Sequence, residues 1–212
     1  MREPINVSGM VLSVSPVGEY DKRVVILTRE LGKITAFARG ARRMKSPLMA
    51  VSNPFVFGEF QVYEGRDSYT LSGANIKEYF LNLAQMQPGV YYGFYFLELA
   101  EYFGQEGNDE TQMLNLLYVT MNAIRRGKQD LRLVRCIFEL RTITISGEAP
   151  QMFSCMECGT KENLTVFSLR DSAIYCPNCG KTIRDPWPLQ PGTVLALSLI
   201  HISEPTRHSL IS

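Results

Sequence analysis

The sequence predicts an α+β multidomain chain, and three observations lead to that prediction. The first 80 of the 212 residues contain short runs rich in β-branched types and bounded by turn residues, as strands are. From residue 75 onward the apolar positions take the spacing of helices. Farther along, four cysteines form two CxxC pairs. We therefore expect strands in 1–80, a helical domain in 81–150 and a metal-binding module in 151–185.

Five segments of the first 80 residues have the composition of strands, and they are 5–14, 23–28, 33–38, 55–63 and 68–72. The connection between the third and the fourth is long, basic and contains prolines. Five antiparallel strands in so short a stretch fit a small closed barrel. An OB-fold is the expected form, and an SH3-like barrel is the alternative.

Three helices should follow the strands. The first, 89–103, is apolar on more than one side and is expected to be buried. The second begins near Asn108 or Asp109, either of which is a suitable N-cap, and ends before Gly127. Its apolar residues keep a spacing of three or four, and they are Met113, Leu114, Leu117, Met121 and Ile124.

A third helix is expected over 131–145, before Gly147. It carries Cys136 in an apolar stretch, where the thiol is expected to be a buried core residue. After the cysteine module, prolines break the chain, and 186–197 is expected to begin a further helix.

Cys155, Cys158, Cys176 and Cys179 have the spacing of a structural zinc site. Seventeen residues separate the two pairs, and a glycine follows each pair at once. Two thiolates from one tight turn reach adjacent corners of a tetrahedron, and the glycine allows the positive φ that turns backbone N–H groups toward the sulfurs. Four thiolates leave no open coordination position, so the expected Zn²⁺ is structural.

Other interpretations of the cysteines remain open. Iron in a rubredoxin-like site uses the same four thiolates. Two disulfides would suit a secreted protein, but no apolar stretch of a signal peptide follows Met1. A thioredoxin-like redox pair needs one CxxC at a strand–helix junction rather than two matched turns. Reduced-looking cysteines and no targeting segment favour the cytoplasm.

The end of the chain, 198–212, resembles a translated sequencing-adapter fragment, SLIHISEPTR, so the natural protein is expected to stop matching near Leu197. Both histidines, His201 and His208, lie in this tail. A body without histidine excludes Ser-His-Asp and Cys-His sites. There is also no phosphate-binding loop, no dinucleotide fingerprint and no apolar run long enough to span a membrane. We expect no enzyme; Glu98 and Glu101, three residues apart on a helix, are better explained as a solvated face.

Positive charge is concentrated in 22–45, which holds a single acidic residue and eight basic ones: Lys22, Arg23, Arg29, Lys33, Arg39, Arg42, Arg43 and Lys45. Four of these, Arg39, Arg42, Arg43 and Lys45, lie on an expected flexible loop beside the barrel, where they would neutralise phosphates whatever the base sequence. Phe37, Tyr63 and Tyr69 would offer rings for base stacking. Solvated charges and core aromatics explain the same residues equally well.

The arrangement as a whole resembles the RecO family of bacterial recombination mediators. The resemblance is carried by 5–43 (INVSGMVLSVSPVGEYDKRVVILTRELGKITAFARGARR), PFVFGEFQVYEG at 54–65, the aromatic-rich helix, and the CxxC pairs ahead of GTVLALS at 192–198. It covers Met1 to about Leu197; beyond that point the sequence is expected to depart from the family, at the place of the family's closing helices.

This resemblance implies an N-terminal OB-fold, a helical domain and a zinc module. It also implies binding of single- and double-stranded DNA, strand annealing and help in loading recombinase, in the cytoplasm and at the nucleoid. The implied partners are RecR and the acidic C-terminal tail of single-stranded-DNA-binding protein.

Within that function, Arg39, Arg42, Arg43 and Lys45 would contact phosphates, with Lys22 and Lys33 as weaker candidates. Arg132 and Arg135 could receive the acidic tail, although ordinary solvated charges explain them too. The alternative function is that of a zinc-stapled protein-interaction adaptor without direct nucleic-acid binding.

Overall fold

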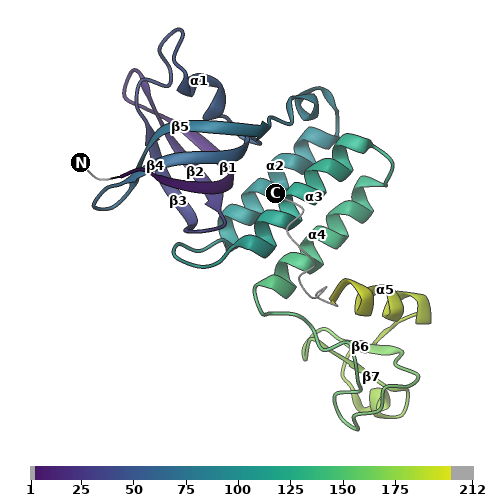
Figure 1. Ribbon diagram of the computed structural model, residues 1–212. Coiled ribbons are helices and arrows are strands. Elements are labelled where there is room, and N and C mark those ends of the chain that lie inside the picture. The colour runs from purple at the N-terminus through teal and green to yellow at the C-terminus, as the bar shows by residue number, and fades with distance from the viewer. Residues whose placement is uncertain (1–2, 202–212) are drawn as a thin grey trace. The chain divides into compact units, whose positions relative to one another are not determined.

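The computed structural model describes residues 3–201, without the side chains of 84 and 198–201. The chain forms two compact units, Met1–Phe138 and Glu139–Ser212. The first contains a barrel and most of the helices, and the second contains the cysteine module (Figure 1). The expectation about an adapter-like tail falls mainly on residues outside the described ones.

Five strands close the barrel in the order β1-β2-β3-β5-β4, so the predicted α+β class with an OB-like barrel is confirmed. The strands are β1 (Ile5–Val17), β2 (Asp21–Thr28), β3 (Gly32–Ala38), β4 (Phe57–Glu64) and β5 (Tyr69–Glu78). The first half of β1 pairs with β4 and its second half with β2, and a bulge between Val11 and Ser13 marks the change. A short parallel pairing of β3 with β5 completes the barrel.

The barrel encloses a largely aliphatic core that also contains Phe60. The fully or almost fully buried side chains include Val7, Val11, Val24, Ile26, Ile34, Phe60, Val62 and Leu71. Burying each such side chain is worth about 1.5–3 kcal/mol. Because alternate residues of each strand point inward, β3 shows a regular alternation of buried and half-buried positions.

The last strand is longer than the sequence predicts. We expect helical spacing from residue 75, but β5 continues to Glu78 because β4 offers hydrogen-bonding partners along the whole segment. A short 3₁₀ turn, Leu81–Gln85, follows and leads to the helices.

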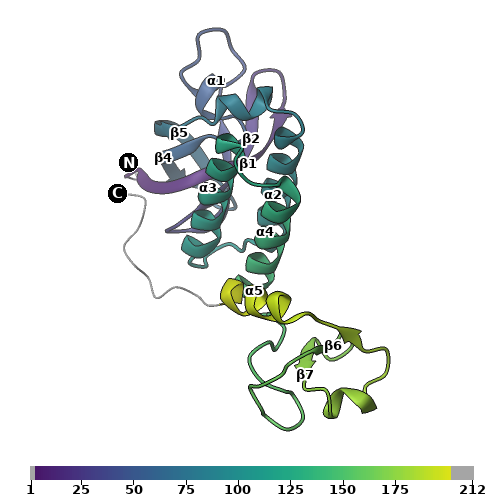
Figure 2. The same ribbon diagram turned by 90° about the vertical axis from the view of Figure 1, so that its right-hand side faces the viewer.

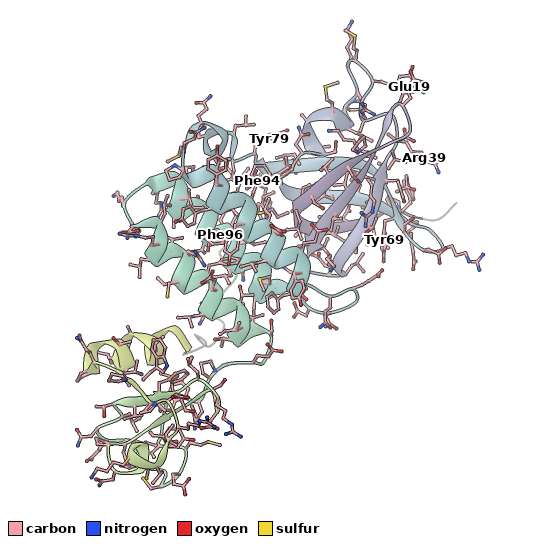
Figure 3. All side chains as sticks on the ribbon, turned by 180° about the vertical axis from the view of Figure 1, so that it is seen from behind. Glu19, Arg39, Tyr69, Tyr79, Phe94 and Phe96 are labelled. Carbon is pink, nitrogen blue, oxygen red and sulfur yellow. The ribbon has the colours of Figure 1, made fainter. Side chains whose placement is uncertain are left out.

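The helix α2 (Gly89–Phe103) is buried on one face only, which corrects the expectation of a helix buried on more than one side. Its inner face carries Phe96, Leu97 and Ala100. Tyr91 and Tyr102 are exposed by 63% and 79%. Figure 3 labels the buried Phe96 and the half-exposed Phe94 on this helix.

The helix α3 (Thr111–Arg126) packs against α2 (Figure 2). Its five predicted apolar residues are all buried, which confirms the helical spacing. The Asp109 carboxylate accepts a hydrogen bond from the Thr111 backbone N–H at 2.9 Å. The N-cap position itself is occupied by Glu110, so neither predicted residue is the N-cap, although Asp109 accepts a hydrogen bond from the first residue of the helix.

The barrel and these helices form one unit because β1 and β2 pack against α2, and β2 also packs against α3. The Phe55 ring meets Phe94 edge-on at 4.7 Å, and Phe57 lies 4.8 Å from the Tyr118 ring. The Lys33 backbone N–H donates to the Gln105 carbonyl at 2.8 Å, so the β2–β3 turn is fixed to the loop between the helices.

The helix α4 (Leu131–Ile145) has the predicted bounds. The expectation that Cys136 is a buried core thiol is wrong, because its side chain is exposed. Cys136 lies on the same side of α4 as Leu133 and Ile137, which are exposed by 54% and 38%. The apolar stretch therefore has an outward-facing side in the part of the chain that the structure describes.

The second unit contains a small sheet in the order β7-β6-β8, built from β6 (Val166–Ser168), β7 (Ala173–Tyr175) and β8 (Trp187–Pro188). Between β7 and β8 lies a 3₁₀ turn, η2 (Cys179–Thr182). The expected later helix is α5 (Pro191–His201). Across residues 3–201, no helix is long and apolar enough to cross a membrane.

Candidate nucleic-acid interface and metal centre

The basic segment 39–45 is a series of hydrogen-bonded turns rather than the flexible loop expected from its composition. The Arg43 N–H donates to the Gly40 carbonyl, and the Ser46 N–H donates to the Arg43 carbonyl. Ala41 is fully buried in the barrel core. The segment, called the basic loop below, is thus anchored to the barrel before it reaches α1 (Leu48–Val51).

The same loop is tied to the turn between β1 and β2. The Arg42 backbone N–H donates to the Tyr20 carbonyl at 2.8 Å, and the Arg42 guanidinium donates to the Gly18 carbonyl at 3.2 Å. The Gly40 N–H donates to the Asp21 carboxylate at 2.7 Å. These contacts join two segments about 20 residues apart into one edge of the barrel.

All four predicted phosphate contacts of the basic loop, Arg39, Arg42, Arg43 and Lys45, are exposed. Figure 3 labels Arg39 on the barrel. The Arg43 guanidinium lies 4.9 Å from the centre of the Tyr20 ring, a cation–π distance. The loop therefore presents several cations on an ordered backbone.

Lys22, one of the two weaker candidates, is half-buried and holds α1 in place. Its ammonium donates to the Asn53 side-chain oxygen at 2.9 Å and to the carbonyls of Met49 and Ser52 at 3.4 Å. Burial lowers the pKa of Lys22, and the nearby Arg42 charge lowers it further.

Lys33, the other weaker candidate, is directed toward the helices. Its ammonium donates to the Glu101 carbonyl at 2.6 Å, near the C-terminus of α2. A cation at that end of a helix interacts favourably with the helix dipole. The structure thus gives Lys33 a role in joining barrel and helices.

The three aromatic residues predicted for stacking differ in exposure. Phe37 and Tyr69 are half-buried, and Tyr69 packs against the barrel core. Tyr63 is exposed by 38%. Sequence reasoning missed Tyr20, which is 42% exposed and lies under Arg43. The available signal was an aromatic residue in the turn segment 18–21 just before the basic strand β2.

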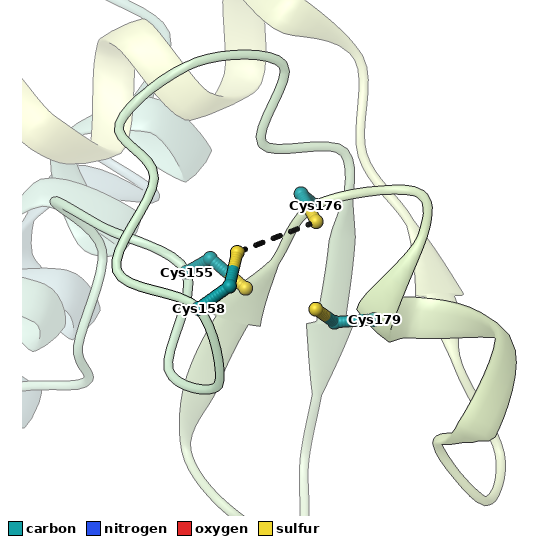
Figure 4. A group of neighbouring side chains, drawn as sticks. All are labelled: Cys155, Cys158, Cys176 and Cys179. Carbon is teal, nitrogen blue, oxygen red and sulfur yellow. Dashed lines mark hydrogen bonds between the residues drawn. The ribbon is translucent and has the colours of Figure 1, made fainter.

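The four predicted metal ligands come together in the second unit (Figure 4). Their sulfur atoms all lie within 4.8 Å of one another, and the Cys158 and Cys176 sulfurs are 3.9 Å apart. A tetrahedral site with Zn–S bonds of about 2.3 Å has sulfur–sulfur edges of about 3.8 Å. The donor set and its spacing therefore fit a four-coordinate thiolate metal site, with zinc as the predicted ion.

The pKa values of the cysteine thiols also indicate that the cluster can bind a cation. Burial opposes ionisation of Cys155, but backbone N–H groups of Cys158, Cys176 and Glu157 lower its pKa to about 6. Hydrogen bonding with Cys176 and burial raise the pKa of Cys179 to about 12. Four thiolates this close together repel one another, and a divalent cation removes that repulsion.

The two glycines after the cysteine pairs have different roles, although one role was predicted for both. Each turn closes with the glycine N–H donating to the first cysteine's carbonyl at 2.9 Å. Gly159 has the predicted positive φ of 72°. Gly180 does not; a Cβ there would lie 2.7 Å from the Val166 side chain. Close packing against β6 explains the second glycine.

The two candidate partner residues on α4 already have intramolecular contacts. The Arg132 guanidinium donates to the Asp130 carboxylate at 3.0 Å, in a pair that is largely solvent-exposed. The Arg135 guanidinium lies 5.5 Å from the centre of the Tyr95 ring.

Glu98 and Glu101 both lie on α2. One hollow lies beside the cysteines and another lies around 78–82 and Arg125, and neither carboxylate lines them. Glu98 is exposed. The position of Glu98 agrees with the interpretation of a solvated helix face, whereas Glu101 is half-buried.

Comparison with known proteins identifies relatives over nearly the whole chain. The family model described as "Recombination protein O N terminal" matches residues 1–80, and "Recombination protein O C terminal" matches residues 89–211. The DNA repair protein RecO of Alkaliphilus metalliredigens is 36% identical over 82% of this chain and 72% of its own length. That of Bacillus pumilus is 31% identical over 96% of this chain and 79% of its own.

Proposed function

The chain belongs to the recombination protein O family, and from that premise we propose that it is a DNA-binding recombination mediator of DNA repair. It binds and anneals single-stranded DNA, also binds duplex DNA, and helps to load recombinase. The observation that supports this most is the basic loop, which places Arg39, Arg42, Arg43 and Lys45 in solvent on one ordered segment of an OB-like barrel.

Phosphate contact is the role assigned to these four side chains. Arginine and lysine release condensed counterions when they neutralise phosphates, and this supplies affinity for any base sequence. The anchored backbone of the loop reduces the entropy lost when the cations are positioned on a strand. Lys22 and Lys33 have intramolecular hydrogen bonds, so they contribute less to this contact.

Annealing follows from the same surface and needs no catalytic residue. Two complementary strands repel each other through their phosphates, and a basic surface that binds both lowers this repulsion. Base pairing then supplies the free energy of the product. The zinc module acts as a structural part, because four thiolates leave the ion no open position for substrate.

Protein partners complete the proposal. RecR and the acidic C-terminal tail of single-stranded-DNA-binding protein are the assigned partners, in the cytoplasm and at the nucleoid of a bacterium. The tail is assigned to α4, where Arg132 and Arg135 lie beside the exposed Leu133 and Ile137. Reversing both arginines to Glu should weaken binding of the tail peptide and leave oligonucleotide affinity within about twofold, because rim charges act on their own partner.

The test of DNA binding is charge reversal. The variant Arg39→Glu, Arg42→Glu, Arg43→Glu should lose binding of a fluorescent single-stranded oligonucleotide by at least about 100-fold, because three phosphate contacts become repulsive. Its thermal midpoint should change little, since exposed charges contribute little to folding. The matched control reverses three exposed cations of the other unit, Lys161, Arg170 and Arg184, and should bind nearly as well as the wild type.

Retained binding by the first variant would refute the phosphate role of the basic loop. If the wild-type chain fails to shift any oligonucleotide, or if heparin does not compete, the protein-interaction adaptor becomes the better account.

A further inference from the structure

Tyr20 is held in a fixed position at the edge of the barrel that carries the basic loop. Its carbonyl accepts the Arg42 N–H at 2.8 Å, and the neighbouring Gly18 carbonyl accepts the Arg42 guanidinium. Asp21, on the other side, accepts the Gly40 N–H. The backbone on both sides of Tyr20 is therefore bonded to the loop, and the ring projects from a segment that cannot shift independently of the cations.

The ring has an arginine against it and remains accessible. The Arg43 guanidinium lies 4.9 Å from the ring centre, yet 42% of Tyr20 is exposed. The hydrogen bond with Glu19, together with burial, raises the pKa of Tyr20, so the ring is uncharged at neutral pH. Tyr20 is thus a neutral, partly exposed ring with a cation against it, next to other groups that attract phosphates.

An aromatic ring beside cations can stack on a base, which a cation alone contacts only through its charge. Unpaired bases stack on exposed aromatic side chains without regard to sequence, because every base has a π-face. Bases inside a duplex are already stacked on their neighbours and cannot use the ring. A ring beside phosphate-binding cations therefore distinguishes single strands from duplexes, whereas the cations bind both.

We propose that Tyr20 is a stacking platform for one unpaired base of a single-stranded nucleic acid, with Arg43 supporting the ring and the basic loop holding the adjacent phosphates. This inference rests on the proposed DNA-binding function and adds a determinant of strand preference to it. Tyr20 takes the place of the three predicted rings, because Phe37 and Tyr69 are half-buried and, among the described residues, Tyr63 has no cation over its ring.

The experiment measures the affinity of the full chain for a single-stranded oligonucleotide and for a duplex of the same length, at fixed salt. Tyr20→Ala should weaken single-strand binding by about 5- to 150-fold, the range for losing one stacked base, and should leave duplex binding within about twofold. Tyr20→Phe keeps the ring and should bind like the wild type. The control Tyr79→Ala removes a tyrosine of similar exposure, 37%, that follows β5 and has no predicted role in binding, and it should change neither affinity more than about twofold.

Stacking has its own signature, which a purely structural loss would not give. A 2-aminopurine base in the oligonucleotide should be quenched on binding by the wild type and by Tyr20→Phe, and less by Tyr20→Ala. Equal losses for single strand and duplex, an unchanged single-strand affinity, or a larger effect of Tyr79→Ala would each overturn the platform while leaving the phosphate role intact. A wild-type chain that binds neither nucleic acid would overturn both proposals.

Discussion

The barrel and the cysteine module differ in what holds them together. The barrel buries a large set of aliphatic side chains together with Phe60 and closes its sheet, so it contains its own source of stability. The module has a smaller core, in which Cys155 and Cys176 are themselves buried members, and its strands are only two or three residues long. A segment with so little apolar burial depends on cross-links or metal. The barrel is therefore expected to be stable through its own core, and the module through its metal.

Of the changes considered, metal removal should give the largest difference in stability between the cysteine module and the barrel. Structural zinc contributes about 10–16 kcal/mol of apparent binding free energy in small thiolate modules. Chelation, or Cys158→Ser, should therefore abolish hydrogen-exchange protection in 151–189 and leave the protection of β1–β5 unchanged. Intact protein should contain one zinc per chain by metal analysis.

The control for this prediction is Cys136→Ser, which changes an exposed cysteine outside the cluster and should leave metal content unaltered. Protection that survives in the module without metal would mean that its apolar core suffices after all.

A cavity in the barrel core should destabilise the barrel and leave the cysteine module unchanged. Phe60 is fully buried, so Phe60→Ala should lower the free energy of unfolding of the barrel by about 3–5 kcal/mol in a denaturant titration. Phe153→Ala, at a phenylalanine that is 48% exposed in the other unit, should cost far less. The distinction between the regions fails if zinc occupancy falls with Phe60→Ala as much as barrel stability does.

The Lys33→Ala variant should show a smaller loss of stability. It tests whether the Lys33 charge stabilises the fold or contacts DNA. Lys33→Ala removes the hydrogen bond to the Glu101 carbonyl and should destabilise the first unit by about 1.5 kcal/mol. Oligonucleotide affinity should stay within about twofold. Lys77→Ala, at an exposed barrel lysine paired with Glu59, is the control and should alter stability by less than about 1 kcal/mol. A large loss of DNA affinity in Lys33→Ala would restore it as a phosphate contact.

The smallest predicted effect depends on pH. Hydrogen bonds from Thr111 and, to a lesser degree, the Arg29 charge lower the pKa of Asp109 below 3.8. The carboxylate therefore stabilises the folded state fully at pH values above 3.8, and this contribution disappears as the pH falls through the lowered pKa. Asp109→Ala should cost about 1 kcal/mol at pH 7 and much less near pH 2.

Asp67→Ala, at an exposed residue between β4 and β5, should show no such difference between the two pH values. A cost for Asp109→Ala that is equal at both pH values would mean that the charge of the Asp109 carboxylate does not stabilise the start of α3.

Much of the fold could be predicted from the sequence because local spacing encodes burial. The apolar set of α3 followed from periodicity, the five strands of the barrel followed from composition and turn residues, and the cysteine spacing predicted the cluster. Features that depend on distant partners could not be predicted. β5 extends past residue 75 because β4 pairs with it, and Cys136 is exposed although its sequence neighbours are apolar.

In the candidate interface, too, some features could be predicted from the local sequence and others depend on residues distant in the sequence. Composition identified the cations of the basic loop, whereas the contact of Arg43 with Tyr20 joins residues 23 positions apart and has no local signature. Lys22 and Lys33 look like surface charges in the sequence, but tertiary hydrogen bonds give them structural partners. Composition shows where the charged residues lie in the sequence. Only the tertiary structure shows which partner each of them contacts.

The salt dependence of single-strand affinity tests most directly whether the basic loop is the phosphate contact. For single strands the logarithm of the binding constant falls with the logarithm of salt concentration by about 0.7 per phosphate neutralised. Replacing Arg39, Arg42 and Arg43 by Gln should reduce the magnitude of this slope by about 2, whereas Tyr20→Ala should weaken binding with the slope unchanged. A slope that stays at the wild-type value in the triple Gln variant would contradict the account.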